Sequence, residues 1–380
     1  MKSCDFLIIG GGIAGASAGY FLSPHGKVLV LEKEQVPGYH ATGRSAAFFA
    51  ETYGNEVVQK LTRASRSFFE TPPEGFSDTP LLSDRGALYV ARPEQEEALV
   101  RDYRYKKKVS PDLEFLSAAE IEAMVPCLKK NYAVSGYREP GCKDIDVHAL
   151  HQGYLRGLKK QGGEILCQTE VCQMEKTREG AWRVLTGTHE IMSPVVINAA
   201  GAWGDVVARL AGVRPVRLQP KRRTVLTLAL NGTPYETIVP ADMPLTLDAE
   251  DDFYFKPESG GLLLSPCDET DCPPCDVQPD EMDIAYAMNR LEQATHIRLR
   301  HIERKWAGLR TFAADRAPVI GYDPTRENYF WCVGQGGFGI QTSPALGRLV
   351  RDLVLRRNVA GHLQLMDLKL TELTVERLRG

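Results

Sequence analysis

The chain has 380 residues, of which 43% are hydrophobic and 25% are charged, and its formal net charge at pH 7 is -3. At roughly 100 to 200 residues per domain, this length allows two or three domains with a substantial core, and the composition argues against a disordered protein, a fibre or a disulfide scaffold. The near-neutral charge lacks the concentrated positive field that nucleic-acid binding requires, so we expect no nucleic-acid partner.

The cysteines and the hydropathy pattern bear on the cellular compartment. The nine cysteines are an odd number without regular spacing, which favours a reducing cytosol. The apolar residues 6–21 are interrupted by Gly10, Gly11, Gly12 and Gly15, so we expect no signal peptide there. No uninterrupted apolar stretch reaches the length of about 18 residues that a transmembrane helix needs. We therefore expect a cytoplasmic protein, whose one route to a membrane is peripheral attachment to its inner face.

The first residues indicate a strand, a glycine turn, a helix and a second strand. Phe6–Ile9 and Val28–Leu31 are continuous apolar runs, as in parallel strands covered on both faces, and a helix is expected over 13–23. This βαβ order is typical of a Rossmann-like sheet. The apolar run 195–200 predicts a further parallel strand, and 147–160 predicts a helix with Asp146 as its N-cap.

Gly10, Gly12 and Gly15 form a GxGxxG pattern between the first strand and the first helix. The glycines permit a tight turn and a close approach of backbone to a pyrophosphate, which the positive end of the helix attracts. Glu32 ends the second strand, where a carboxylate can bind the ribose hydroxyls of a dinucleotide. The alternative is a plain glycine turn beside a surface glutamate, and the combination of strand, helix and acid argues against it.

The choice between NAD and FAD rests on the rest of the chain. A reductase that carries both nucleotides usually needs a second GxGxxG unit, and none is visible. Thr42, Arg44 and Ser45 could contact a diphosphate from the side opposite the glycines. A glycine-rich loop at 334–339 precedes a helix for which we expect Ser343 as N-cap and Pro344 as first residue. The positive end of such a helix would stabilise the negative charge of a reduced flavin, which favours FAD.

A second sheet is predicted from segments rich in β-branched and aromatic residues at 85–92, 223–230, 252–256 and 261–265. The predicted fold class is α/β (α+β): a Rossmann-like FAD-binding domain with a second, mainly antiparallel β-sheet domain for the substrate. We expect the FAD-binding domain to be assembled from 1–84, 145–220 and 306–380, and the substrate domain from 85–144 and 221–305.

Several longer strings carry a resemblance to a known family. They are PGYHATGRSAA (37–47), ALHQGYLRG (149–157), NAAGAW (198–203), GVRPVRLQPKRR (212–223), WAGLR (306–310) and GQGGFGIQTS (334–343). The chain resembles the D-amino-acid oxidase-type (DAO) FAD-dependent oxidoreductases, which include glycine oxidase and sarcosine oxidase. Within that group it looks most like bacterial FAD-dependent D-arginine dehydrogenases of broad D-amino-acid specificity. The resemblance covers essentially the whole chain.

The resemblance implies an FAD site and a substrate site. The implied cofactor-binding residues are Gly10, Gly12, Ile13, Ala14, Gly15, Glu32, Lys33, Thr42, Gly43, Arg44, Ser45, Ala46, Ala47, Val171, Ala200, Gly201, Trp203, Gly308, Arg310, Gly334, Gly336, Gly337, Phe338, Gly339, Ile340 and Gln341. The implied substrate residues are Tyr53, Arg222, Tyr254 and Arg310 around the substrate carboxylate, and Gly337 and Gln341 at its amine and side-chain end. Paired guanidinium groups and phenols are well suited to bind a carboxylate.

The implied activity is the oxidative deamination of D-amino acids to 2-oxo acids and ammonia, with hydride transfer from Cα to flavin N5. In arginine-preferring relatives a histidine and a glutamate receive the substrate guanidinium, and these positions are Phe48 and Ala87 here. Burial of an unpaired guanidinium is costly, so we expect a preference for neutral, hydrophobic side chains. Glu51 could restore an acid nearby.

Alternatives remain open at this point. A glycine- or sarcosine-type oxidase that uses oxygen, or a non-catalytic FAD-binding assembly protein, would share much of this sequence. The electron acceptor, a quinone or oxygen, and the oligomeric state are not decided. Cys267, Cys272 and Cys275 form a CxxxxCxxC pattern, but a zinc site would need a fourth ligand, so we expect a proline-rich surface loop and no metal.

Overall fold

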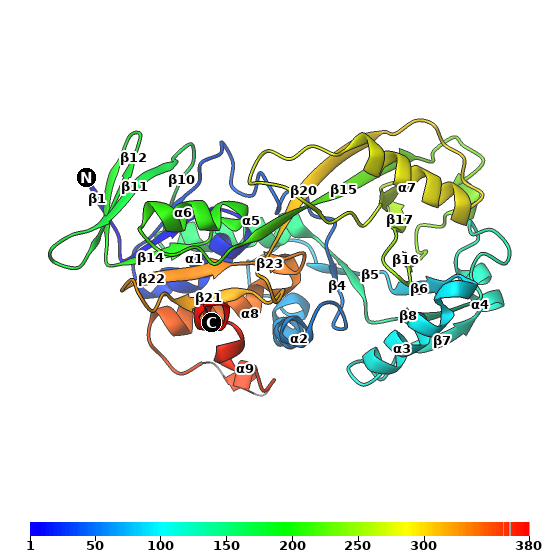
Figure 1. Ribbon diagram of the computed structural model, residues 1–380, viewed down its shortest axis with the longest axis horizontal. Coiled ribbons are helices and arrows are strands. Elements are labelled where there is room, and N and C mark those ends of the chain that lie inside the picture. The colour runs from blue at the N-terminus through cyan, green and yellow to red at the C-terminus, as the bar shows by residue number, and fades with distance from the viewer. Residues whose placement is uncertain (360, 365, 380) are drawn as a thin grey trace.

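A computed structural model describes residues 1–359, 361–364 and 366–379, and these residues form two large sheets that lie side by side (Figure 1). The first sheet has six strands in the order β10-β3-β2-β14-β22-β21, and β21 alone runs antiparallel to its neighbour. Its strands are β2 (Phe6–Ile9), β3 (Val28–Leu31), β10 (Glu164–Leu166), β14 (Val195–Asn198), β21 (Val319–Tyr322) and β22 (Tyr329–Val333). The expected Rossmann-like parallel sheet is confirmed.

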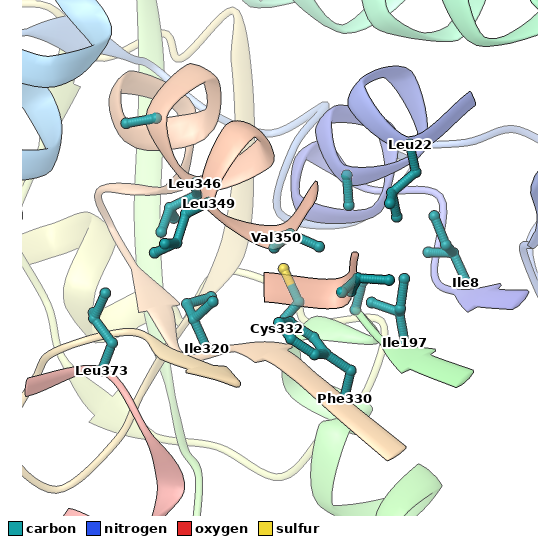
Figure 2. Packing of buried hydrophobic residues seen from close by; sticks show 14 of the residues in the cluster. Ile8, Leu22, Ile197, Ile320, Phe330, Cys332, Leu346, Leu349, Val350 and Leu373 are labelled. Atoms are coloured by element: carbon teal, nitrogen blue, oxygen red, sulfur yellow. The ribbon is translucent and has the colours of Figure 1, made fainter. Parts of the chain in front are cut away.

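The six-stranded sheet is covered on both faces, which explains why its strands are continuously apolar. On one face pack the helices α1 (Ile13–Leu22), α2 (Glu56–Glu70), α5 (Val147–Lys160) and α8 (Gly339–Val354). Figure 2 shows this core, where Ile8 of β2 lies near Leu22 of α1 and Ile320 of β21 lies near Leu349 of α8. The other face is covered by a smaller sheet of β1 (Lys2–Ser3), β11 (Val171–Lys176), β12 (Trp182–Thr186) and β13 (Glu190–Ser193), and by α6 (Gly204–Leu210).

The second large sheet has ten strands and is antiparallel except where β16 meets β6. Along its main path lie β23 (Gln335–Gly336), β20 (Arg304–Phe312), β15 (Gln219–Ala229), β18 (Gly261–Ser265), β17 (Tyr254–Glu258), β16 (Leu245–Asp248), β6 (Ala87–Ala91), β8 (Ser135–Glu139) and β7 (Glu114–Ser117), while β19 (Thr270–Asp271) pairs with β15. The helices α4 (Ala118–Met124) and α7 (Glu281–Ala294) cover its outer face. Its inner face carries a separate cluster that includes Ala87, Val225 and Tyr254.

The remaining α-helices and strands lie around the two sheets. They are α3 (Glu96–Lys106), α9 (Gly361–Gln364) and a three-stranded sheet of β4 (Phe48–Phe49), β9 (Lys143–Ile145) and β5 (Leu82–Asp84). Within the described parts of the chain, every helix is too short or too polar to cross a bilayer.

The expected division into two domains differs from the sheet composition at β20 and β23, because β23 and most of β20 lie within 306–380 but belong to the ten-stranded sheet. Residues 85–144 and 221–305 supply most of the ten-stranded sheet, as expected. However, β20 continues to Phe312 and pairs along its whole length with β15, so residues 306–312 belong to the second sheet rather than the first. A division by sheets would therefore place this boundary after β20.

Two helix starts test the capping predictions. Asp146 caps α5 as expected, because its carboxylate accepts a hydrogen bond from the N–H of Ala149 at 2.8 Å. The predicted start of the last long helix is wrong: α8 begins at Gly339, so Ser343 and Pro344 lie inside it. Pro344 has no N–H to donate to the carbonyl group of Ile340, and the hydroxyl of Ser343 donates to that oxygen at 3.0 Å.

Candidate functional site

One elongated cavity lies between the two sheets and has an empty volume of about 1790 Å³, including its open mouth. It begins at the carboxyl ends of β2, β3 and β14, where ligands of open α/β sheets bind. It ends under the inner face of the ten-stranded sheet, where Val225 of β15, Tyr254 of β17 and Arg310 of β20 line it. The cavity therefore connects the expected nucleotide site with the expected substrate site.

The glycine loop forms the floor at the first end of the cavity. Gly10 has φ +108°, and a Cβ there would lie 2.4 Å from the carbonyl oxygen of Ala199 on the neighbouring strand's loop. A Cβ on Gly15 would lie 1.9 Å from the carbonyl oxygen of Gly10. Both positions therefore require glycine. Gly10 and Gly12 line the cavity, whereas Gly15 packs behind the loop, as the third glycine of such a pattern does.

Glu32 lies where the pattern predicts it, at the end of β3 and on the wall of the cavity. It is 7% exposed, and its carboxylate accepts the N–H of Gly11 at 2.9 Å and the N–H of Glu34 at 3.0 Å. These two bonds hold the carboxylate against the glycine loop and leave further lone pairs for a ligand. Beside it, the ammonium of Lys33 lies 3.6 Å from the ring centroid of Trp203, and both residues line the cavity.

His151 supports the glycine loop from behind, a role that the sequence did not reveal. This histidine of α5 is 4% exposed, and its Nε2 lies 2.9 Å from the carbonyl oxygen of Gly11. Since a carbonyl group can only accept, Nε2 carries the hydrogen. Burial lowers the pKa of His151, while the bond to Gly11 acts in the opposite direction. The neutral imidazole thus holds the loop that Glu32 holds from the other side.

Most residues of the segment 40–47 line the cavity beside the glycine loop. The hydroxyl of Thr42 accepts the N–H of Ile13 at 2.9 Å. Arg44 lines the cavity and donates to the carbonyl oxygens of Val277 at 3.0 Å and Ala307 at 3.1 Å, and it also pairs with Asp276. Arg44 therefore joins the nucleotide end of the cavity to a loop of the second sheet.

Most of the sequence-predicted site residues line the cavity. Those that do are Gly10, Gly12, Ile13, Ala14, Glu32, Lys33, Thr42, Arg44, Ser45, Ala46, Ala47, Tyr53, Val171, Ala200, Gly201, Trp203, Tyr254, Gly308, Arg310, Gly336, Gly337, Gly339, Ile340 and Gln341. Gly15, Gly43, Gly334, Phe338 and Arg222 lie outside the lining. Each of the four other than Arg222 is next in the sequence to a residue that lines the cavity.

Arg310 is the principal cation at the second end of the cavity. Its guanidinium donates to the hydroxyl group of Tyr53 at 3.1 Å. Among the described residues, no carboxylate lies within ion-pair distance of it, although an arginine side chain stays charged in proteins. Burial raises the pKa of Tyr254 nearby, against the effect of Arg310 and Arg223, so this phenol is a neutral hydrogen-bond donor.

Arg222 does not line the cavity, whereas its neighbour Arg223 does. Along β15 successive side chains point to opposite faces, and the pairing of Arg223 with Gly308 and of Lys221 with Arg310 puts Arg223 on the face of Arg310. Arg223 lines the cavity and donates to the backbone of Asp268 at 2.9 Å. Arg222 pairs with Asp283 at 2.8 Å on the other face. The structure therefore contradicts the expected position of Arg222 at this cavity.

Gln341 has a buried amide donor without a protein partner. Its Oε1 accepts the N–H of Ala50 at 3.1 Å, whereas its Nε2 has no hydrogen-bond partner among the described residues, although the side chain is 2% exposed and lines the cavity. An unmet buried donor costs about 1 to 3 kcal/mol unless a ligand satisfies it. Gly337 lies on the same wall, where a Cβ would come within 2.9 Å of the Arg310 guanidinium.

Phe48 and Ala87, the two positions at which the sequence predicts no partner for a cationic substrate, are apolar. Phe48 lines the cavity and Ala87 is buried beneath it. Glu51 does not restore an acid, because Arg66 pairs with it at 2.8 Å. Glu139, directly opposite Ala87 in the sheet, is 2% exposed and accepts the hydroxyl of Thr52 at 2.6 Å. Burial raises the pKa of Glu139, which favours its uncharged form.

The sequence alone did not identify Arg223 or His151, because the position of each depends on a contact between distant segments. Arg223 could have been found from the alternation of β15, had the pairing with β20 been known. His151 lies in one of the quoted strings, but its contact with Gly11 joins positions 140 residues apart. No group of three or more histidine, cysteine, aspartate or glutamate side chains within the described ranges could hold a metal ion.

The chain is similar to known flavoproteins over nearly its whole length. The model of a family described as FAD dependent oxidoreductase (DAO) matches residues 5–353. Glycine oxidase from Geobacillus kaustophilus is 26% identical over 94% of each chain. Human mitochondrial dimethylglycine dehydrogenase is 22% identical over 92% of this chain, which spans only 42% of that protein.

Solved structures share the fold. The crystal structure of glycine oxidase from Geobacillus kaustophilus has a TM-score of 0.82 with 22% identity and covers 99% of both chains. A glycerophosphate oxidase from Mycoplasma pneumoniae, solved with FAD bound, has a TM-score of 0.83 with 18% identity, covering 93% of this chain and 95% of that one. These likenesses confirm the expected mixed α/β fold with a second sheet.

The cavity fits the cofactor of such proteins. Its first end has the glycine floor and the carboxylate of Glu32 for a nucleotide, and its second end has glycine-rich walls at 336–339, the start of α8 and the unmet amide of Gln341 for a polar ring system. Together with the match over residues 5–353, this shows that the chain belongs to the DAO family of FAD dependent oxidoreductases and that its cofactor is FAD.

Proposed function

We propose that this oxidoreductase deaminates neutral D-amino acids to 2-oxo acids and ammonia, and that it acts as a dehydrogenase. The observation that carries the proposal is Arg310, a cation on the cavity wall for which the described residues provide no carboxylate partner. An amino acid supplies the missing anion. Arg223 lies on the same face of the sheet, and the hydroxyl groups of Tyr53 and Tyr254 lie on the same wall.

The walls around this end favour a neutral substrate side chain. Phe48 provides an aromatic surface, and the nearby acids are either paired, as Glu51 is with Arg66, or buried and held by a hydroxyl, as Glu139 is by Thr52. A cationic side chain would lose its hydration here without gaining a charged partner, which costs several kcal/mol. A hydrophobic side chain meets no such penalty.

The protein's own part in the reaction is binding and orientation. Bound FAD supplies a two-electron acceptor. Arg310, Arg223 and Tyr53 would fix the carboxylate, so that the α-carbon and the amine have one orientation along the cavity. The amine must be neutral before oxidation, and at this end of the cavity the described lining offers phenols and guanidinium groups but no carboxylate base. The ammonium proton therefore passes to water in this proposal.

A glycine- or sarcosine-type amine oxidase is the second candidate. It is supported by the likeness to glycine oxidase across 99% of both chains. Such an enzyme would accept the smallest amines and would pass electrons to oxygen. The same carboxylate site would serve both kinds of substrate, so the acceptor and the side chain distinguish them.

An anaerobic substrate panel tests the proposal. Purified holoenzyme is mixed with D- and L-forms of alanine, leucine, phenylalanine and arginine, and with glycine and sarcosine, and the bleaching of the flavin absorbance is followed. We expect neutral D-amino acids to give the highest kcat/KM. D-Arginine as the best substrate, or faster reduction by L-amino acids, would overturn the proposal, and glycine or sarcosine as the best substrate would establish the second candidate. For a dehydrogenase, we expect a quinone analogue to reoxidise the reduced flavin quickly and air to reoxidise it slowly.

A further inference from the structure

Cys272 and Cys275 form a thiol pair on the outer wall of the cofactor cavity. Their Sγ atoms lie 3.6 Å apart in the loop between β19 and α7. Both side chains are partly exposed, and all nine cysteines are free thiols. No other contact between two cysteines occurs in the part of the chain that the structure describes.

The backbone on both sides of the pair is anchored. The N–H of Cys272 donates to the carbonyl oxygen of Pro220 on β15 at 3.0 Å. After the pair, Asp276 accepts the hydroxyl of Tyr39 at 3.2 Å, and Arg44 binds the carbonyl oxygen of Val277 at 3.0 Å. The two residues between the cysteines are prolines, whose φ angles are fixed by their rings. These contacts and the prolines restrict the backbone, and the sulfur atoms, 3.6 Å apart, must approach by about 1.5 Å to form a disulfide bond.

The pair touches the wall of the site. Cys272 and Cys275 pack against a small cluster that contains Ala202, Trp203 and Leu309, all three of which line the cofactor cavity. The third cysteine of the sequence pattern is elsewhere, since Cys267 packs against the cluster with Tyr254 on the inner face of the sheet. Two thiols without a third ligand are a poor metal site but a suitable redox site.

We propose that Cys272 and Cys275 are a reversible dithiol–disulfide site that reacts with small disulfides and hydroperoxides. Oxidation breaks two S–H bonds and forms one S–S bond, and the two electrons and two protons pass to the oxidant. A disulfide such as oxidised glutathione is then reduced to two thiols, and hydrogen peroxide is reduced to two molecules of water. A dithiol reductant reverses the reaction by thiol–disulfide exchange.

The test follows the thiols of the holoenzyme by mass. The protein is incubated with oxidised glutathione or with hydrogen peroxide, the free thiols are alkylated, and the digested protein is mapped by tandem mass spectrometry. We expect a 272–275 disulfide with either oxidant, and we expect dithiothreitol to restore two alkylated thiols. Cys275→Ser should form no internal disulfide, whereas Cys267→Ser should form it as the wild type does.

Three results would overturn the proposal. They are full alkylation of Cys272 and Cys275 after either oxidant, a stable mixed disulfide with glutathione on one of them, and loss of the disulfide in Cys267→Ser. Each result is independent of the substrate that the enzyme oxidises, because the measurement is the mass of the peptides that contain Cys272 and Cys275. Retention of the flavin spectrum in both variants shows that they are folded.

Discussion

Replacement of Arg310 by methionine tests whether this guanidinium group binds the substrate carboxylate. In the free protein this guanidinium has the hydroxyl of Tyr53 as its hydrogen-bond partner at 3.1 Å and, within the described ranges, no carboxylate at ion-pair distance. Its removal therefore leaves no protein acid unpaired, and the loss should fall on substrate binding. A hydrogen bond to a charged group contributes about 1.5 to 3 kcal/mol. Two parallel bonds to a carboxylate then contribute at least about 3 kcal/mol, which predicts a fall in kcat/KM of about 100-fold.

Arg222→Met is the matched control. The two arginines lie on adjacent strands of one sheet, but Arg222 is on the other face and pairs with Asp283 at 2.8 Å. Its loss should lower the thermal stability, because it leaves acids without a cation. Since Arg222 does not line the cavity, its loss should change the free energy of substrate binding by about 0.5 kcal/mol at most, so kcat/KM should change by about twofold at most.

The assay is stopped-flow reduction of the flavin without oxygen, with a D-amino acid and with the corresponding amino acid amide. The amide has no carboxylate, so Arg310→Met should affect it far less than the acid. An equal loss for acid and amide would refute the carboxylate role. A loss in Arg222→Met as large as in Arg310→Met would refute the assignment of faces along β15.

Three further substitutions probe the same cavity. Tyr53→Phe removes the hydroxyl bound to Arg310, and the loss of about 0.5 to 1.5 kcal/mol predicts a fall in kcat/KM of about 2- to 10-fold, measured in the same assay. Glu32→Gln weakens the bond to the N–H of Gly11, and we expect the FAD dissociation constant to rise by about tenfold, measured by the fluorescence of released FAD. His151 is held neutral by burial, so its folded-state pKa is below the unfolded value of about 6.5 and its stabilisation is lost as the pH falls below that value. The melting temperature of His151→Gln should therefore fall less between pH 7.5 and pH 5 than that of the wild type, and equal slopes would contradict this.

Local sequence was sufficient for the nucleotide half of the site. The glycine turn, the acid at the end of β3 and the apolar parallel strands are each determined within about 30 residues, because a turn, a helix start and two strands form one unit. The start of α8 shows the limit of such reasoning. Ser343 and Pro344 fit a helix start, but the hydroxyl of Ser343 meets the carbonyl group that Pro344 cannot bond, and the helix begins earlier.

The substrate half was decided by the tertiary structure. The sequence KRR on β15 offers two adjacent arginines, and nothing local to them states which one faces the cavity. Because side chains alternate along a strand, a shift of one residue moves a guanidinium from one face of the sheet to the other. The pairing of Arg223 with Gly308, 85 residues further along the chain, determines which of the two arginines faces the cavity. The sequence by itself thus determined the fold class and the glycine floor, whereas the register between distant strands decided which charged side chains face the cavity.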